Sequence, residues 1–278
     1  MVRKLELKLE SKIKLNNGQL MPIFGLGTWN LNGKTAYNSI IWALDSGYRL
    51  IDTAMIYGNE REIGKALIDS NLPREEIFIT SKVWNTDQGY EATLKAFNQS
   101  LRRLKLTYLD LYLIHWPATP LRNESWKALE KIYDEGLVKS IGVSNFTIRH
   151  IKELLTTASI KPIVNQFELS PFLYQQNLID YCQGNEIIVE AYSPLTRGRR
   201  LNSEILNKLS SKYNKSAAQI LLRWALQHNF IVIPKSSSKE HLIENAEIFD
   251  FYIQEPDMNI LDNLNENFRI GDDPHSMA

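Results

Sequence analysis

Four side chains suited to acid–base chemistry follow successive apolar runs of the chain. They are Asp52 and Tyr57 in "LIDTAMIYGNE", Lys82 in "IFITSKVW" and His115 in "LDLYLIHW". A lone carboxylate is costly to bury, so we expect Asp52 to pair with Lys82. The ammonium is expected to lower the pKa of the Tyr57 phenol and make it a general acid toward a developing alkoxide. His115 would orient the substrate oxygen by hydrogen bonding.

Short apolar runs that alternate with amphipathic stretches must position these groups. We expect strands at 23–29, 49–54, 77–84, 109–116, 138–146, 163–169, 187–195 and 230–236, and helices at 90–104, 125–136, 216–228 and 256–266. The second helix would be opened by Ser125 as a cap and closed by Gly136. Strands alternating with helices favour a parallel sheet covered by helices.

Eight such units without a linker predict one (β/α)8 TIM barrel domain over residues 1–278. An open doubly wound sheet is the alternative, and it is disfavoured because no G-x-G-x-x-G follows the first strand. The turn signal Asn17-Gly18 lies between two short apolar runs and predicts a β-hairpin. This hairpin would plug the N-terminal end, or bottom, of the barrel.

Charge and composition exclude several classes of function. The 32 basic and 32 acidic residues give a net charge of +0, so no nucleic acid or anionic membrane partner is expected. The single cysteine, Cys182, can form no internal disulfide, which suits a reducing compartment. The first residues contain no apolar stretch typical of a secretory signal, and no apolar run of about 18 residues occurs, so we expect neither export nor membrane spanning and favour the cytoplasm. The five histidines do not cluster, so no metal site is expected; His150, His228 and His275 are expected at the surface.

In a barrel of this type the chemistry takes place where strands end. Tryptophans at these ends would form the apolar wall of a small-molecule pocket, namely Trp29, Trp84 and Trp116. Further polar groups at the ends of the later strands are Ser144, Asn145, Gln166, Glu168, Glu190, Tyr192, Ser193, Lys235 and Ser236. Each residue alone has a purely structural interpretation, such as a buried ion pair or a packed histidine. The set at neighbouring strand ends favours a catalytic site.

Eight motifs in order resemble the aldo-keto reductase superfamily over residues 14–265, and the short tail resembles its prokaryotic members. The motifs are "GLGTW", "DTAMIYGNE", "SKVWNTDQG", "LDLYLIHWP", "IGVSNF", "VNQFELSP", "AYSPL" and "IPKSSSKEHLIENAEIFDF". The resemblance implies a (β/α)8 barrel that reduces aldehydes and ketones with a nicotinamide dinucleotide bound without a Rossmann motif. It implies that Tyr57 is the proton donor, that Lys82 and Asp52 tune it, and that His115 positions the carbonyl.

The same resemblance implies the cofactor contacts. Ser144, Asn145 and Gln166 would bind the nicotinamide carboxamide, and Tyr192, with Ser193 beside it, would stack on the ring. Further contacts would be Leu195 and Arg197, with Arg199 or Arg200, along the pyrophosphate; Lys235, Ser236 and Ser238 at the 2′-phosphate; and Glu244 and Asn245 near the adenine.

Two departures from the family pattern affect specificity. His241 occupies the position of an arginine that clamps the 2′-phosphate in many members; a histidine is mostly neutral at pH 7, so we expect NADPH as the preferred cofactor with measurable use of NADH. The tail after residue 266 is short, which predicts an open pocket and broad use of short polyol aldehydes, sugars and α-dicarbonyls. We expect a monomer or a weak homo-oligomer.

Three other functions compete with this interpretation. Glu168 and Glu190 could be the carboxylate pair of a glycoside hydrolase, but this leaves Tyr57 unexplained, and strand parity places Glu190 deeper in the barrel on the face of Tyr192. A Schiff-base aldolase on Lys82 is weakened by Asp52, which stabilises the charged, non-nucleophilic amine. A regulatory or structural protein that only binds the cofactor is disfavoured by the intact catalytic set.

Overall fold

Parallel strands form a closed ring at the centre of the computed structural model, which describes residues 7–118 and 120–277. In ring order they are β3 (Leu26–Gly27), β4 (Leu50–Asp52), β5 (Phe78–Val83), β6 (Leu111–Ile114), β7 (Ile141–Ser144), β8 (Val164–Glu168), β9 (Ile188–Tyr192) and β10 (Ile231–Val232). Backbone hydrogen bonds join the first strand region to the last, from Gly25 N to Val232 O at 2.9 Å and from Gly27 N to Pro234 O at 3.1 Å. The predicted barrel is therefore confirmed, and the open doubly wound sheet is not present.

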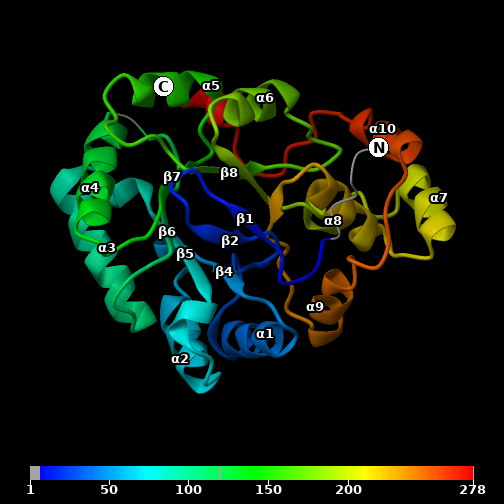
Figure 1. The fold of residues 1–278 in the computed structure, drawn as a ribbon, viewed down its shortest axis with the longest axis horizontal. Coiled ribbons are helices and arrows are strands. Elements are labelled where there is room, and N and C mark those ends of the chain that lie inside the picture. Colours follow the sequence, from blue (N-terminus) through cyan, green and yellow to red (C-terminus); the bar gives the residue numbers. More distant parts are fainter. Residues whose placement is uncertain (1–6, 119, 278) are drawn as a thin grey trace.

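Helices surround the ring on its outside (Figure 1). They are α1 (Gly33–Asp45), α2 (Glu60–Asp69), α3 (Tyr90–Leu104), α4 (Arg122–Asp134), α5 (Ile148–Leu155), α6 (Gln176–Gly184), α7 (Glu204–Tyr213), α8 (Ala217–Gln227), α9 (Lys239–Ala246) and α10 (Glu255–Asp262). The predicted Ser125 cap is wrong. Helix α4 begins three residues earlier, and Ser125 lies inside it, where its hydroxyl accepts a hydrogen bond from Gly89 N at 2.8 Å.

The expected hairpin lies across the bottom of the barrel. Strands β1 (Lys12–Lys14) and β2 (Leu20–Pro22) pair antiparallel, and Figure 1 shows them in dark blue over the centre of the ring. Gly18 takes a φ of +87°, which a glycine adopts without strain. The hairpin inserts the buried side chains of Leu15 and Met21 among residues that begin the barrel strands.

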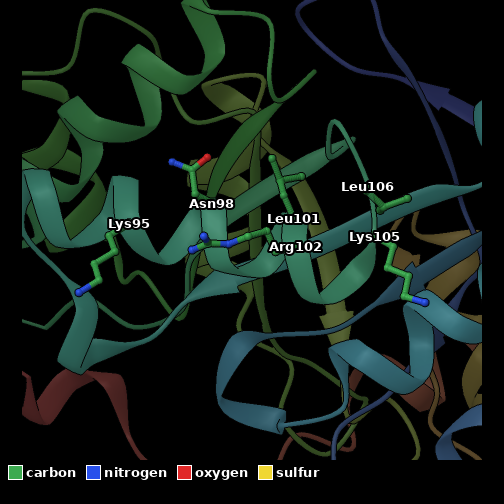
Figure 2. A pocket seen from close by; sticks show the side chains of 6 residues that line it. All are labelled: Lys95, Asn98, Leu101, Arg102, Lys105 and Leu106. Carbon is green, nitrogen blue, oxygen red and sulfur yellow. The ribbon is translucent and has the colours of Figure 1, made fainter.

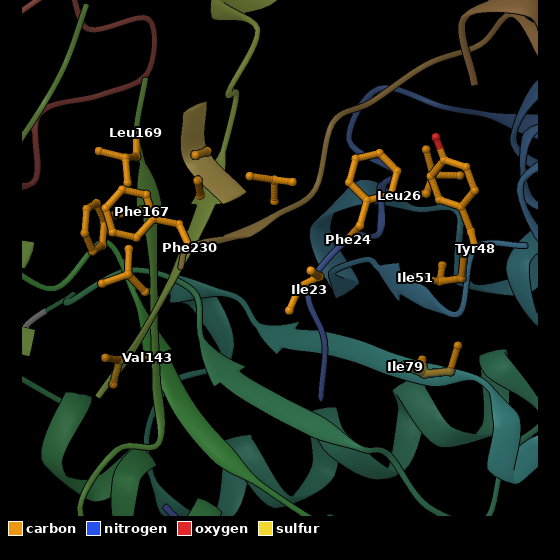
Figure 3. Close-up of a cluster of buried hydrophobic side chains, with 14 of the residues drawn as sticks. Ile23, Phe24, Leu26, Tyr48, Ile51, Ile79, Val143, Phe167, Leu169 and Phe230 are labelled. Atoms are coloured by element: carbon orange, nitrogen blue, oxygen red, sulfur yellow. The ribbon is translucent and has the colours of Figure 1, made fainter. Parts of the chain in front are cut away.

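The alternation of side chains along each strand separates two apolar layers. One face of the strands packs under the helices, and Figure 3 shows Ile51, Ile79, Val143 and Phe167 from this layer. The opposite face fills the barrel interior, where the first inward residues are apolar, namely Leu50, Phe78, Leu111, Val164 and Ile188. Because side chains alternate with a period of two residues, the next inward-facing residues toward the C-terminal end of each strand lie on the same face. These residues form the candidate site.

The histidine prediction is wrong for His150. This residue is fully buried at the start of α5, where its Nδ1 accepts a hydrogen bond from Thr147 N at 3.2 Å and completes a capping box. His228 is half-buried beside Asp262 at 2.8 Å, and of these three histidines His275 alone is exposed. The His150 ring bonds a residue of its own helix start and the His228 ring bonds a residue of α10, and composition alone reveals neither partner.

Within residues 7–118 and 120–277, no helix is long and apolar enough to cross a membrane. The same residues contain no group of three or more His, Cys, Asp and Glu side chains arranged to hold a metal ion.

Candidate active site

A buried ion pair lies at the centre of the site. Lys82 Nζ donates to Asp52 Oδ1 at 2.6 Å and to the Thr53 carbonyl at 2.8 Å, while Gln166 Nε2 donates to Asp52 Oδ2 at 2.9 Å. Lys82 is 0% exposed and Asp52 is 2% exposed. Burial raises the pKa of Asp52, and the ammonium and amide donors oppose this shift. The pair predicted from strand ends β4 and β5 is therefore present.

A second carboxylate lies next to this pair, inside the barrel. Gln166 Nε2 also donates to Glu190 Oε2 at 2.8 Å, whereas the buried Glu190 Oε1 has no hydrogen-bond partner among the described residues. Burial, followed by the charge of Asp52, raises the pKa of Glu190 to about 8. Glu190 is deeper than Tyr192, as strand parity predicts, since only the tyrosine lines the pocket.

Tyr57 lies above the pair, at the end of a short turn over Met55–Tyr57. Its ring centre is 5.1 Å from Lys82 Nζ. The expectation of a lowered phenol pKa is wrong: burial first, then the charges of Asp52 and Glu190, raise the pKa of Tyr57 well above its usual value. The ammonium does not lower the pKa of Tyr57, because burial dominates and Asp52 offsets the positive charge. The phenol is consequently protonated at neutral pH, the form that a proton donor requires.

His115 forms the opposite wall of the same space. Its ring meets Tyr57 edge-on at 5.6 Å between ring centres and Trp84 at 5.2 Å. Burial, with the charge of Lys82, lowers the pKa of His115 well below its usual value, so the imidazole is neutral. Its Nδ1 is buried without a protein partner among the described residues. A neutral imidazole offers one N–H donor and one acceptor nitrogen.

These groups open into a pocket of about 840 Å³. The predicted residues that line it are Trp29, Asp52, Tyr57, Trp84, His115, Trp116, Asn145, Gln166, Tyr192, Ser193, Leu195, Arg197 and Lys235. Lys82 lies beneath Asp52, and Ser144 and Ser236 are buried outside the lining. Ser238, His241, Glu244 and Asn245 lie on α9 or at its N-cap and do not line the pocket. Arg199 and Arg200 do not line it either, and Arg200 is paired with Glu266 at 2.9 Å.

Two connections organise the wall opposite Asp52. Asn145 has a left-handed backbone with φ of 62°, its Nδ2 donates to the His115 carbonyl at 3.0 Å, and its Oδ1 accepts from the Tyr192 hydroxyl at 2.8 Å. Such strained residues concentrate at functional sites. At the mouth, the Arg197 guanidinium lies 4.1 Å from the centre of the Trp29 ring. The strand ends β6, β7 and β9 are thus fixed relative to one another.

The C-terminal tail contributes a wall that sequence reasoning missed. Ile270, Gly271 and Asp272 line the pocket although the tail is short. Both oxygens of the buried Glu168 accept hydrogen bonds from this segment, from Ile270 N at 2.7 Å and from Gly271 N at 2.8 Å. Glu168 is therefore committed to the tail, which argues against its role as the acid or nucleophile of a glycosidase. The only signal in the sequence was an acid at a strand end.

A separate hollow of about 620 Å³ lies on the outer surface of α3 (Figure 2). It is lined by Lys95, Asn98, Leu101, Arg102, Lys105 and Leu106, none of which is a predicted site residue.

Comparison with known proteins gives concordant matches along almost the whole chain. The model of the aldo/keto reductase family matches residues 24–266. A glyoxal reductase of Bacillus subtilis (strain 168) is 52% identical over 270 residues, which are 97% of this chain and 98% of that protein. The solved structure of MGS-M4, an aldo-keto reductase from a Medee basin deep-sea metagenome library, matches with a TM-score of 0.93 at 46% identity, covering 96% of this chain and 99% of that one. A Bombyx mori aldo-keto reductase in complex with NADP matches with a TM-score of 0.90 at 34% identity, covering 96% of each chain.

Proposed function

The chain belongs to the aldo/keto reductase family, and on this premise we propose that it reduces short aldehydes, sugars and α-dicarbonyls to alcohols with NADPH. The observation that carries this proposal is the buried Asp52–Lys82 pair beneath Tyr57 and His115 in one open pocket. The α-dicarbonyl class is supported by the relative named a glyoxal reductase.

The residues of the pocket fit a nicotinamide dinucleotide. The pocket has about 840 Å³, within the range of ligand sites. Gln166 Nε2 donates hydrogen bonds to two carboxylates, whereas its Oε1 accepts none from a described residue. This oxygen can therefore accept a hydrogen bond from the carboxamide of the cofactor. Tyr192 offers a ring at the wall, and Arg197 and Lys235 offer cations for phosphates at the mouth. When bound, the reduced cofactor supplies the hydride that the carbonyl carbon accepts.

The chain's own residues would handle the proton and the orientation. The Tyr57 hydroxyl makes no hydrogen bond to a described residue, so it is available to donate its proton to the carbonyl oxygen as negative charge develops there. His115 is neutral and would hold that oxygen by hydrogen bonding. The tyrosinate left after transfer would take up a proton from solvent, as the raised pKa of Tyr57 favours. The tryptophans would exclude water from the reacting carbonyl.

The cofactor preference depends on α9. Ser238 caps this helix, with its hydroxyl accepting from His241 N at 3.3 Å, and the side chain of His241 is exposed. We propose that Ser236, Ser238 and Lys235 bind the 2′-phosphate and that His241 contributes only weakly. NADPH is then preferred, and NADH retains measurable activity.

The test is NADPH oxidation, followed by absorbance, with glyceraldehyde and with glyoxal. Tyr57→Phe should keep cofactor binding, measured by fluorescence quenching, and lose about 10²- to 10⁴-fold in kcat, the usual contribution of general acid catalysis. The matched control is Tyr37→Phe, since Tyr37 bonds Asp69 on the surface and does not line the pocket.

Two outcomes would redirect the proposal. If the unmodified protein binds NADPH but reduces no aldehyde, ketone or dicarbonyl in a panel, a cofactor-binding regulatory role replaces the enzyme. If Tyr57→Phe turns over at the unmodified rate, another group donates the proton.

A further inference from the structure

The buried charges beneath the pocket do not balance. Asp52, Lys82 and Glu190 are each at most 2% exposed, and the first two are in direct contact. Gln166 joins both carboxylates through a single nitrogen. With two carboxylates and one ammonium, a fully ionised cluster would carry one uncompensated negative charge in the barrel interior. Burying such a charge is expensive, so the cluster retains a proton instead.

The contacts decide which carboxylate holds this proton. Asp52 touches the ammonium at 2.6 Å, whereas Glu190 touches only the neutral amide of Gln166. The charged and titratable groups facing Glu190 are Asp52 from β4, Lys82 from β5 and Tyr57 from the turn after β4. On its other side β10 offers only the apolar Ile231, in register with it. Glu190 is thus the neutral member, with a free oxygen at Oε1.

Resting on the proposed function, we propose that Glu190 is a positioning residue whose proton is linked to the redox state of the cofactor. It keeps the proton when the reduced, uncharged nicotinamide occupies the pocket, and releases it to solvent when the oxidised, cationic ring does. Gln166 both lines the pocket and contacts Glu190, so the added cation faces the same buried cluster. Two cations then match two carboxylates, and no charge is left uncompensated.

This linkage predicts that NADP⁺ and NADPH differ in the number of protons released when they bind. Both forms carry the same phosphates, so protons exchanged by these groups cancel in the comparison. Because the pKa of Glu190 is raised to about 8, about 0.9 of the molecules carry its proton at pH 7. Binding of NADP⁺ should therefore release up to about 0.9 proton more than binding of NADPH. The ratio of the Kd for NADP⁺ to that for NADPH should fall about tenfold from pH 6 to pH 7.

The experiment is isothermal titration of the protein with NADP⁺ and with NADPH at pH 7 in two buffers of different ionisation enthalpy, which counts the protons exchanged. In Glu190→Gln the amide oxygen still accepts from Gln166, and the difference between the two forms should vanish. Glu168→Gln is the matched control, since that buried glutamate bonds the tail rather than the cluster, and it should keep the difference.

The outcomes separate this inference from the proposed function. The inference is overturned if NADP⁺ and NADPH release the same number of protons in the unmodified protein, or if their difference in proton release persists in Glu190→Gln. If Tyr57→Phe abolishes the difference and Glu190→Gln does not, the phenol is the source and the inference also fails. Should Glu190→Gln not fold, the pH dependence of the Kd ratio in the unmodified protein decides, since a flat ratio from pH 6 to 9 refutes it. Failure of both cofactor forms to bind contradicts the proposed function instead.

Discussion

Removing the Lys82 ammonium beneath Tyr57 should destabilise the barrel more than removing the ammonium of a surface lysine. Lys82 donates to Asp52 and to the Thr53 carbonyl with no exposure to solvent. In Lys82→Met the carboxylate of Asp52 remains buried with only the Gln166 amide. Breaking a buried pair in this way costs about 3–5 kcal/mol at neutral pH. The double variant Asp52→Asn/Lys82→Met removes both charges and should recover more than half of that loss.

The loss should depend on pH in a defined direction. Without the ammonium, burial holds the folded-state pKa of Asp52 above its unfolded value of about 3.9. The folded state then binds the proton more tightly, so the destabilisation is smallest below about pH 4 and grows by up to about 1.4 kcal/mol per pH unit until the folded-state pKa is passed. Lys82→Met should accordingly be less destabilised at pH 5 than at pH 8.

Urea unfolding followed by circular dichroism at pH 5 and pH 8 measures these differences. Lys65→Met is the matched control, because it also removes a lysine paired with an aspartate, but with the lysine side chain 63% exposed. An exposed pair of this kind contributes about 0–1 kcal/mol. The reasoning is refuted if Lys82→Met is no worse than the control, or if the double variant loses as much as the sum of its single variants.

Three further predictions test the pocket, the cofactor site and the packing. Gly271→Ala places a Cβ 3.2 Å from Glu168 Oε2, so the tail must shift and Michaelis kinetics should show a several-fold higher KM for glyoxal with kcat little changed; an unaltered KM would mean that the tail does not contact the substrate. His241→Arg adds a permanent charge at α9 and should raise the NADPH over NADH ratio of kcat/KM by about tenfold, whereas an unchanged ratio would place the 2′-phosphate elsewhere. Gly64→Ala places a Cβ 2.5 Å from the Leu104 carbonyl and should lower stability in urea by about 1–3 kcal/mol, while Gly184→Ala, with nothing within 4 Å of the new atom, should not.

The barrel and most of the candidate site could be predicted from the sequence, because both follow from local patterns. The apolar runs contain all the barrel strands that the structure describes, and their alternation places Leu50 below Asp52 and Ile188 below Glu190 on the inward face. Since neighbouring parallel strands end at one rim, residues far apart in the chain meet there. The single-domain span of residues 1–278, the oligomeric state and the roles of the site residues stay predictions.

Other features required contacts that the apolar pattern does not identify, within one turn or between distant segments. The capping box that buries His150, the helix start that precedes Ser125 and the tail held by Glu168 each depend on partners that local periodicity does not identify. The helix-cap and histidine expectations failed because apolar periodicity identifies neither the start of α4 nor the Thr147–His150 capping box.

The sequence by itself determined which chemical groups reach the end of the barrel, since a period of two residues fixes the face on which each side chain lies. Only the tertiary structure decided their protonation. The pKa of Tyr57 is raised rather than lowered, and that of Glu190 is raised as well, because both depend on desolvation and on the charges that the fold brings near them. A pKa reflects all the charges and solvent around a group, and these come from every strand of the barrel at once.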